Sequence, residues 1–357
     1  MTTVESRTMK VLIAGNMGYI GPVVVDHLRS LYPAATIVGV DTGFFAGCLL
    51  DPLDFPESNV DLQYFADIRS MPDRVLDGVD AVIDLAALSN DPLGNRFSEL
   101  TLDVNFRAAV TLAKRAKNAG ARTFVFASSC SVYGLAADGA RTETSPVNPL
   151  TPYARSKVAA EAALAEIADP DFLITCLRFA TACGASPRLR LDLVLNDFVA
   201  SAVACGEIRI LSDGTPWRPL IAVRDMARAI EWAALSRDAS AGPHVVVNVG
   251  SNDWNWQIKD LAEAVASVVP GTSVCIAPDG QPDTRSYRVD FGLFRALAPS
   301  HQPACSLRDT VTELKRALES VGFRDAGFRK SRFNRLHVLT KLFENDTAAP
   351  WFHEAAA

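Results

Sequence analysis

The sequence lacks several features that would define its class at once. No apolar run of its 357 residues approaches the ~20 residues of a membrane-spanning helix. The first ten residues, MTTVESRTMK, lack the apolar stretch of a signal peptide. An excess of positive charge is also missing, because 35 basic residues face 41 acidic ones and give a net charge of −6. We therefore expect a cytoplasmic protein with neither nucleic acid nor membrane as a partner.

Metal-binding patterns are absent as well. The seven cysteines form no C-x-x-C pair and do not cluster with the five histidines at the spacing of metal ligands. We interpret the cysteines as buried, reduced thiols and expect no metal site. What remains is a composition of 49% hydrophobic and 21% charged residues, which indicates a globular protein with a sizeable core.

Short apolar runs alternate with helix-like stretches in the first half of the chain. Such runs are typical of buried parallel strands, and their alternation with helices predicts an α/β fold with a doubly wound parallel sheet of the Rossmann type. The predicted strands are Val11–Ala14, Ile37–Val40, Ala81–Leu85, Thr123–Ala127 and Leu173–Leu177. The predicted helices are Tyr19–Leu31, Leu102–Ala119 and Tyr153–Ile167.

After about residue 180 the rhythm breaks into segments rich in Pro, Gly and Arg, with helices predicted at 193–204 and 223–235. We predict a Rossmann domain at 1–180, a smaller, irregular α/β C-terminal substrate domain at 181–325, and a tail at 326–357. Residues 245–250 are compatible with a return to the main sheet, so the boundary need not be a single cut. For the tail we make no structural prediction.

The segment VLIAGNMGYIG places three glycines directly after a strand and at the start of a helix. Glycine permits the tight turn and the close approach of a pyrophosphate to the backbone at a helix N-terminus, so this context predicts a dinucleotide-binding loop. An ordinary strand-to-helix turn is the alternative. The candidate residues of the loop are Gly15, Gly18, Tyr19, Ile20 and Gly21.

Asp41 ends the next predicted strand, 26 residues after Gly15. A carboxylate there can accept hydrogen bonds from both ribose hydroxyls and would repel a 2′-phosphate, which favours NAD over NADP. The alternative is a carboxylate that caps the turn before Gly43. Asp67 and Ile68 follow another apolar stretch. They either contact the adenine of the cofactor or lie in a surface turn.

Small residues close the strand that ends near Asp84. Leu85, Ala86 and Ala87 would let a cofactor lie against the backbone, so they join the cofactor-binding candidates.

Tyr153 and Lys157, in the motif YARSK, are four residues apart and therefore project from one face of a helix. An ammonium beside a phenol lowers the tyrosine pKa and suits proton exchange with a hydroxyl group. A plain helix pair is the alternative. Upstream, ASSCSVYG supplies Ser128, Ser129 and Ser131, which either donate hydrogen bonds to a substrate oxygen or form a turn.

These motifs follow successive strands, at the edge where open sheets bind ligands. In this joint order the sequence, from about Lys10 to about Leu318, resembles the extended short-chain dehydrogenase/reductase family, specifically its nucleotide-sugar epimerase/dehydratase branch. The resemblance implies that Ser129 hydrogen-bonds the reacting hydroxyl and that Tyr153 is the general base. It implies that Lys157 binds the nicotinamide ribose and lowers the tyrosine pKa.

The resemblance also implies residues that support or bind the ligands. Asn105, in DVNFRAA, matches the asparagine before the family's helix bend near the active site. Its implied role is structural, and we count it among the residues next to the cofactor. Arg218 and Arg285 match arginines that contact the substrate diphosphate, for which guanidinium forks are suited. Surface arginines are the alternative. Asn196 lies near an asparagine that touches the same diphosphate.

Two neighbouring residues leave two interpretations open: Asn90 and Asp91 bind sugar hydroxyls, or Asp91 begins a turn with Pro92. The substrate-binding candidates are Asn90, Ser129, Ser131, Asn196, Arg218 and Arg285.

The sequence departs from the family where dehydratases carry an Asp-Glu pair after the catalytic hydroxyl residue, because Cys130 and Ser131 stand there. Neither replaces an acid or a base, so 4,6-dehydration is disfavoured. Epimerisation needs only hydride removal, rotation of the keto sugar and hydride return. We therefore predict an NAD-dependent epimerase of a nucleoside-diphosphate sugar, acting at carbon 4. Thr181 stands where many epimerases have a nucleotide-contacting asparagine, so the identity of the substrate sugar stays open.

Three alternatives remain open. The same residues suit a reductase or dehydrogenase, or a dehydratase, of a nucleotide-linked sugar. A non-enzymatic alternative is an NAD-binding protein whose partner interactions follow the redox state of the cofactor. Because helices of the kind that carries Tyr153 pair into a four-helix interface in the family, the resemblance also implies a homodimer.

Overall fold

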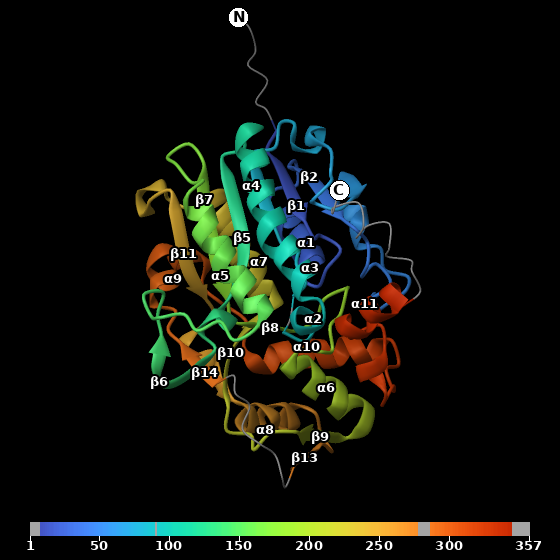
Figure 1. The fold of residues 1–357 in the computed structure, drawn as a ribbon. Coiled ribbons are helices and arrows are strands. Elements are labelled where there is room, and N and C mark those ends of the chain that lie inside the picture. The colour runs from blue at the N-terminus through green and yellow to red at the C-terminus, as the bar shows by residue number, and fades with distance from the viewer. Residues whose placement is uncertain (1–7, 90, 278–285, 345–357) are drawn as a thin grey trace, which may run out of the picture.

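A parallel sheet of seven strands forms the centre of the molecule, in the order β11-β7-β5-β4-β1-β2-β3 (Figure 1). The computed structural model describes residues 8–89, 91–277 and 286–344. The sheet confirms the predicted doubly wound fold. Its strands are β1 (Lys10–Ala14), β2 (Thr36–Asp41), β3 (Leu62–Phe65), β4 (Ala81–Asp84), β5 (Thr123–Ser129), β7 (Leu173–Phe179) and β11 (His244–Val249).

The central strands are apolar on both faces because helices cover both. In β1, Val11 and Ile13 belong to one hydrophobic cluster, whereas Leu12 and Ala14 belong to the other. Side chains alternate between the faces of a strand, so one short run supplies two cores.

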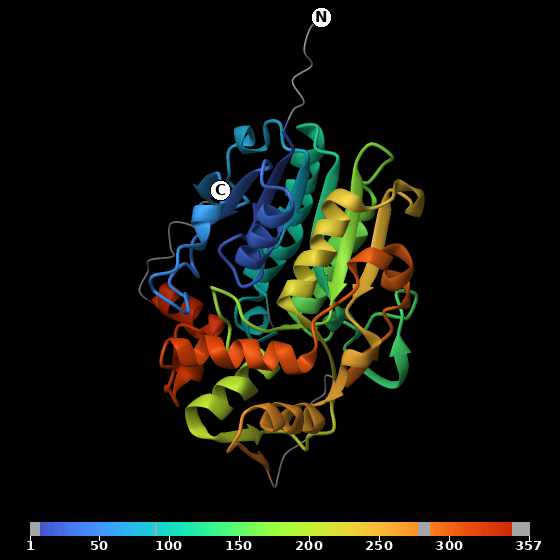
Figure 2. The ribbon, with the colours of Figure 1, turned by 180° about the vertical axis from the view of Figure 1, so that it is seen from behind.

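Two helix layers enclose the sheet. α4 (Ala109–Asn118) and α5 (Pro152–Ala165) cover the face seen in Figure 1, and α1 (Gly21–Leu31) and α7 (Val223–Glu231) cover the face seen in Figure 2. α7 lies beyond residue 180, and β11 pairs with β7 in the main sheet, so the chain returns to the large layer after leaving it.

The predicted helix at 102–119 is interrupted. α2 (Asp91–Arg96) and α3 (Ser98–Leu102) are followed by a π-helical turn at Asp103–Ala108, and only then does α4 begin. Within that turn, the Asn105 amide accepts a hydrogen bond from Leu88 N at 2.8 Å and donates to Leu88 O at 3.0 Å. The π-helical turn thus fixes the backbone after β4. The periodicity of apolar residues in the sequence does not reveal such a turn.

β3 was not predicted as a strand. It is the outer strand of the sheet, and its end residues Leu62 and Phe65 are exposed. Because neither face is well buried, the apolar pattern that marks the central strands is missing.

The smaller part of the molecule confirms the predicted irregular α/β region and lies at the bottom of Figure 1. A core that includes Leu195, Leu261 and Leu314 holds its helices together. Its helices are α6 (Val194–Cys205), α8 (Ile258–Val268) and α10 (Leu307–Ser320), with α9 (Gly292–Leu297) nearer the main sheet. Three small sheets belong to this part or lie beside it. One consists of β8 (Thr181–Cys183), β10 (Trp217–Ala222) and β12 (Asn255–Gln257). The other two are the pairs β9 (Glu207–Ile210) with β13 (Ser273–Ile276) and β6 (Leu135–Arg141) with β14 (Ser286–Val289).

α11 (Arg335–Glu344) occupies the segment for which we made no prediction. Leu339 of this helix packs with Leu88 and Leu93, beside α2. Within the described ranges, no helix is both long and apolar enough to cross a membrane.

A buried ion pair joins the two parts of the molecule. Arg188, in the segment after β8, donates to both carboxylate oxygens of Glu57 at 2.5 and 2.9 Å. Glu57 lies in a short 3₁₀ helix, Pro56–Asn59, beyond β2. Both side chains are less than a tenth exposed, so each charge depends on the other.

We expect Arg188→Met to lower the free energy of unfolding by about 3–5 kcal/mol, because it leaves the Glu57 carboxylate buried without a counter-charge. Urea unfolding of both proteins measures the difference. The double variant Arg188→Met/Glu57→Gln removes the stranded charge and should recover part of the loss; a double variant as unstable as the single one contradicts this explanation.

Candidate functional site

One large cavity lies at the carboxyl ends of the main strands, between the sheet and the smaller part. Its volume is about 860 Å³, within the range of small-molecule sites. Gly15 follows β1, Asp41 ends β2, Leu85 follows β4 and Ser129 ends β5, and all four line the cavity. This is the edge at which open α/β sheets bind ligands.

Most of the predicted site residues share this cavity. Three do not line it, namely Gly21, Asn105 and Asn196, and two, Asn90 and Arg285, lie outside the described residues. The predicted residues that line it are Gly15, Gly18, Tyr19, Ile20, Asp41, Asp67, Ile68, Leu85, Ala86, Ala87, Ser129, Ser131, Tyr153, Lys157 and Arg218.

The Asn196 amide is fully buried below the cavity wall. It accepts a hydrogen bond from Gly184 N at 2.8 Å and donates to Arg190 O at 2.9 Å. These bonds fix the segment between β8 and α6. A diphosphate contact by Asn196 therefore stays a prediction, and in this structure its polar atoms bind backbone atoms and the Tyr19 hydroxyl.

The glycine loop packs directly against the backbone that follows β4. Gly15 has a φ of +81°, and a Cβ atom there would lie 2.7 Å from Leu85 C and from Ala86 N. A Cβ on Gly21 would lie 2.1 Å from Asn16 O. Only glycine allows these approaches, which bring the N-terminus of α1 to the cavity. Loop amides and the positive end of the helix dipole suit an anion there.

Two of the predicted cofactor-binding residues, Asp41 and Asp67, are carboxylates on the cavity wall. Asp41 accepts hydrogen bonds from Met17 N at 3.0 Å and Gly43 N at 2.8 Å, and it remains part of the cavity wall. Burial raises its pKa, and the two backbone donors oppose that rise. Asp67 is held by Arg69 at 2.7 and 3.0 Å. The glycine loop and Asp41 fit NAD, and these residues would hold its diphosphate and adenosine ribose.

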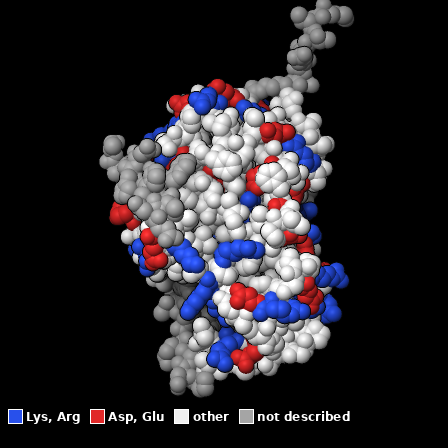
Figure 3. Space-filling model, turned by 90° about the vertical axis from the view of Figure 1, so that its right-hand side faces the viewer, with Lys and Arg blue, Asp and Glu red and all other residues white. Residues whose placement is uncertain are grey.

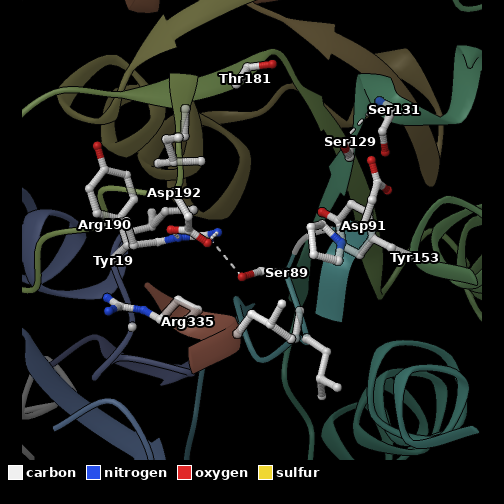
Figure 4. Close-up of a pocket in the computed structure, with 18 of the residues that line it drawn as sticks. Tyr19, Ser89, Asp91, Ser129, Ser131, Tyr153, Thr181, Arg190, Asp192 and Arg335 are labelled. Carbon is white, nitrogen blue, oxygen red and sulfur yellow. Dashed lines mark hydrogen bonds and ion pairs between the residues drawn. The ribbon is translucent and has the colours of Figure 1, made fainter. Parts of the chain in front are cut away.

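The predicted catalytic residues meet at one end of the cavity, where Figure 4 shows Ser129 and Tyr153. Thr151 caps α5 by accepting a hydrogen bond from Ala154 N at 3.1 Å, which fixes the first turn of the helix. Tyr153 lies in that turn. Its enclosure raises its pKa to about 12, and hydrogen bonding to Ser129 opposes the rise.

Lys157 lies one turn further along α5 and is 2% exposed. Its Nζ is 4.4 Å from the centre of the Phe126 ring and 5.7 Å from that of Tyr153. Burial lowers its pKa to about 8, and the nearby Asp84 carboxylate opposes the shift. The predicted lowering of the tyrosine pKa is not seen in this structure, because burial outweighs the groups that lower it and the Tyr153 pKa is raised.

Sequence reasoning missed the buried network that supports this end of the cavity. Ser128 donates to Glu161 at 2.5 Å, and Glu161 binds Arg178 through hydrogen bonds of 2.7 and 3.0 Å. Arg178 in turn donates to the Tyr133 hydroxyl at 3.0 Å. Glu161 is four residues after Lys157, so helical spacing was an available signal.

A second group of charges at the opposite end was also missed. Arg190 binds both oxygens of Asp192 at 3.0 and 2.9 Å and donates to Ser89 Oγ at 2.9 Å. Figure 4 shows this group beside Tyr19 and Arg335, across the cavity from Tyr153. The run RLRLD was visible in the sequence, although we interpreted it only as part of an irregular loop.

The fold and the cavity define an α/β protein of the Rossmann type with a dinucleotide loop. The profile of the NAD dependent epimerase/dehydratase family matches residues 11–250, more than half of the chain, and the protein belongs to this family of enzymes. This confirms the resemblance to the nucleotide-sugar epimerase/dehydratase branch of the extended short-chain dehydrogenase/reductases, and it confirms NAD as the cofactor.

Individual relatives divide between two activities. The Bacillus subtilis protein YtcB, described as an uncharacterized UDP-glucose epimerase, is 27% identical over 264 residues, which cover 68% of this chain and 77% of YtcB. A dTDP-glucose 4,6-dehydratase of Streptomyces griseus is 26% identical over 317 residues, which cover 85% of this chain and 93% of the dehydratase. The solved structure of MoeE5 with UDP-glucose and NAD is 26% identical, has a TM-score of 0.72, and covers 87% of this chain and 99% of MoeE5.

We expect Gly15→Ala to abolish retention of NAD during purification, because the added methyl group meets backbone that cannot move aside. The bound nucleotide is released by denaturation and quantified by chromatography.

Gly120→Ala is the matched control. Gly120 also has a positive φ, +88°, but a Cβ there meets nothing within 4 Å. Both substitutions carry a strain of about 1–2 kcal/mol, whereas only the first disturbs the loop. Equal NAD content in the two variants would show that the close contact at Gly15 is not needed for the cofactor.

Proposed function

We propose that the protein is an NAD-dependent epimerase of a nucleoside-diphosphate sugar that inverts carbon 4. The observation that carries the proposal is a cavity end with Ser129, Tyr153 and Lys157 but no carboxylate at the two positions after Ser129. That set suffices for reversible oxidation of a hydroxyl group, whereas elimination of water requires a further acid and base.

The two residues after Ser129 behave differently in the structure. Cys130 is 1% exposed and donates to Arg178 O at 3.0 Å, and burial raises its pKa well above the usual range. It therefore stays a packed thiol. Ser131 lines the cavity, and its Oγ has no hydrogen-bond partner among the residues that the structure describes. It can donate to a sugar oxygen.

In the proposed reaction, Ser129 holds the reacting hydroxyl by a hydrogen bond, and Tyr153 takes its proton and later gives it back. NAD, which the glycine loop and Asp41 would hold, would supply reversible hydride transfer at carbon 4. Lys157 keeps a positive charge beside Tyr153 and stabilises the phenolate form. The net change is inversion at one carbon, with no oxidation or reduction overall.

Arg218 is the proposed contact for the substrate diphosphate in the smaller part. It lies in β10, lines the cavity, and its guanidinium carbon is 5.9 Å from the centre of the Tyr287 ring. A guanidinium binds phosphate oxygens bidentately. Contacts by Asn90 and Arg285, the domain boundaries, the homodimer and the cytoplasmic location stay predictions.

Dehydration is the second candidate, and one observation favours it. Asp91 lines the cavity beside Tyr153, and its charge raises the tyrosine pKa. It accepts a hydrogen bond from the Thr151 hydroxyl at 2.6 Å. A carboxylate so placed could remove the proton from carbon 5 of an oxidised hexose.

One experiment separates these activities. The protein is incubated in deuterium oxide with a panel of nucleoside-diphosphate hexoses, and the products are analysed by nuclear magnetic resonance. An epimerase yields the carbon-4 epimer without deuterium at carbon 5, whereas a dehydratase yields a 4-keto-6-deoxy sugar labelled there. Turnover only with a stoichiometric supply of external cofactor would indicate a reductase or dehydrogenase. Nucleotide-sugar binding without any product would favour the non-catalytic alternative.

We expect Tyr153→Phe to lower kcat by about 10²–10⁴-fold, because the general base is lost while the ring that lines the cavity remains. Bound NAD per subunit should be unchanged. Full activity of this variant would remove Tyr153 from the mechanism.

We expect Asp84→Asn to move the alkaline limit of activity to lower pH. Asp84 opposes the fall in the Lys157 pKa, so its loss lets that pKa drop below about 8 and the ammonium deprotonates earlier as the pH rises. The pH profile of kcat/KM measures the shift. Asp73→Asn is the control, because Asp73 is exposed and pairs with Arg115, and its profile should match that of the parent.

A further inference from the structure

α11 forms a wall of the cavity although it lies outside the residues that match the family. The match ends at residue 250, whereas Arg335, Leu336 and Leu339 of α11 all line the cavity. Leu336 and Leu339 belong to one apolar cluster with Phe44 and Phe45, which follow β2. The C-terminal helix thus closes the cavity on the side of the β2 end, where Asp41 lies.

Arg335 is the charged residue that this wall contributes. Its side chain is 1% exposed, and its Nη2 donates to Arg188 O at 3.0 Å. Its Nη1 is buried and has no hydrogen-bond partner within the described part of the chain. The guanidinium carbon lies 4.8 Å from the centre of the Phe45 ring. One face of the cation is packed, and one of its donors remains unused.

The carboxylate whose charge acts on Arg335, that of Asp192, is already engaged by another arginine. Asp192 pairs with Arg190 through two hydrogen bonds. Burial, together with Arg190 and Arg188, lowers the pKa of Arg335 to about 10, so it still carries its charge at neutral pH. A buried cation with an unused donor calls for an anionic ligand.

The position of Arg335 indicates which anion it meets. In Figure 4, Arg335 lies at the end of the cavity that Tyr19 forms, across from Tyr153 and Ser129. Tyr19 belongs to the glycine loop, and its hydroxyl donates to Gly184 O at 2.7 Å. Figure 3 views the molecule from the side on which α11 lies in Figure 1. Basic side chains gather across the middle of this face, with acidic ones beside them. A diphosphate held by the glycine loop would lie at this end.

We propose that Arg335 is a cofactor-binding residue whose guanidinium contacts the diphosphate of NAD, and that α11 thereby retains the cofactor. Guanidinium groups bind phosphate oxygens through charge-assisted hydrogen bonds, and here the low exposure keeps water from competing. The proposal depends on NAD binding and not on the epimerase reaction, so a different reaction would leave it intact.

Exchange of bound NAD tests the proposal without any turnover. The purified holoenzyme is mixed with isotopically labelled NAD, and the rate at which the label enters the protein is measured after rapid gel filtration. We expect Arg335→Met to exchange at least about tenfold faster, the effect of losing one charge-assisted hydrogen bond. Arg335→Lys keeps the charge and should fall between Arg335→Met and the parent.

Arg332→Met is the matched control, because it removes the same charge three residues earlier. Arg332 is exposed and does not line the cavity. Its exchange rate should equal that of the parent. Equal rates for the parent, Arg335→Met and Arg332→Met would overturn the proposal.

Thermal stability separates ligand binding from a structural role and identifies the diphosphate. The rise in Tm caused by added ADP-ribose should shrink in Arg335→Met, whereas the rise caused by UDP should not. Adenosine, which lacks a diphosphate, should act equally on parent and variant. A loss confined to UDP would assign Arg335 to the substrate, and a lower Tm with unchanged NAD exchange would make its role structural; either outcome overturns the proposal.

Discussion

The site depends on one close contact between backbones, that of the glycine loop after β1 with the segment after β4. Gly15 leaves no room for a side chain between them, and Asn105 holds the same segment from the other side through both polar groups of Leu88. Two loops that would otherwise move independently therefore form one rigid floor. The first turn of α1 and the end of β4, with Asp84, take their positions from it.

Around that floor, charged groups are held in pairs before any ligand arrives. Glu161 with Arg178, Glu57 with Arg188, and Asp192 with Arg190 each consist of a carboxylate and a guanidinium that are largely buried. Such pairs contribute little to stability when compared with apolar side chains, but they fix orientation. Arg190 and Asp192 line the cavity, so the charges of this pair need little reorganisation when charge moves during a reaction.

The sequence was most informative where function depends on local spacing. The glycines, Asp41, and the pair Tyr153 and Lys157 are defined by neighbours within one turn or one strand end, and periodicity finds such patterns. Arg335 was missed because its backbone partner, Arg188 O, is 147 residues away along the chain. Arg190 was missed although Asp192 is only two residues away, because nothing in RLRLD indicates that this segment lines a cavity. β3 escaped for a different reason, since an exposed edge strand carries no apolar alternation. Asn196 shows the converse, because a resemblance names a residue type but not the direction in which its amide points.

The return of the chain to the main sheet has a mechanical consequence. β7 is followed by β8 in the smaller part, yet α7 covers the main sheet and β11 extends it. Several covalent crossings thus join the two parts, where a simple two-domain enzyme has one hinge. A fragment ending at residue 180 would leave β7 without β11, one of its two neighbours, and one face of the sheet without α7. The main sheet is therefore complete only once residues beyond 180 have returned to it.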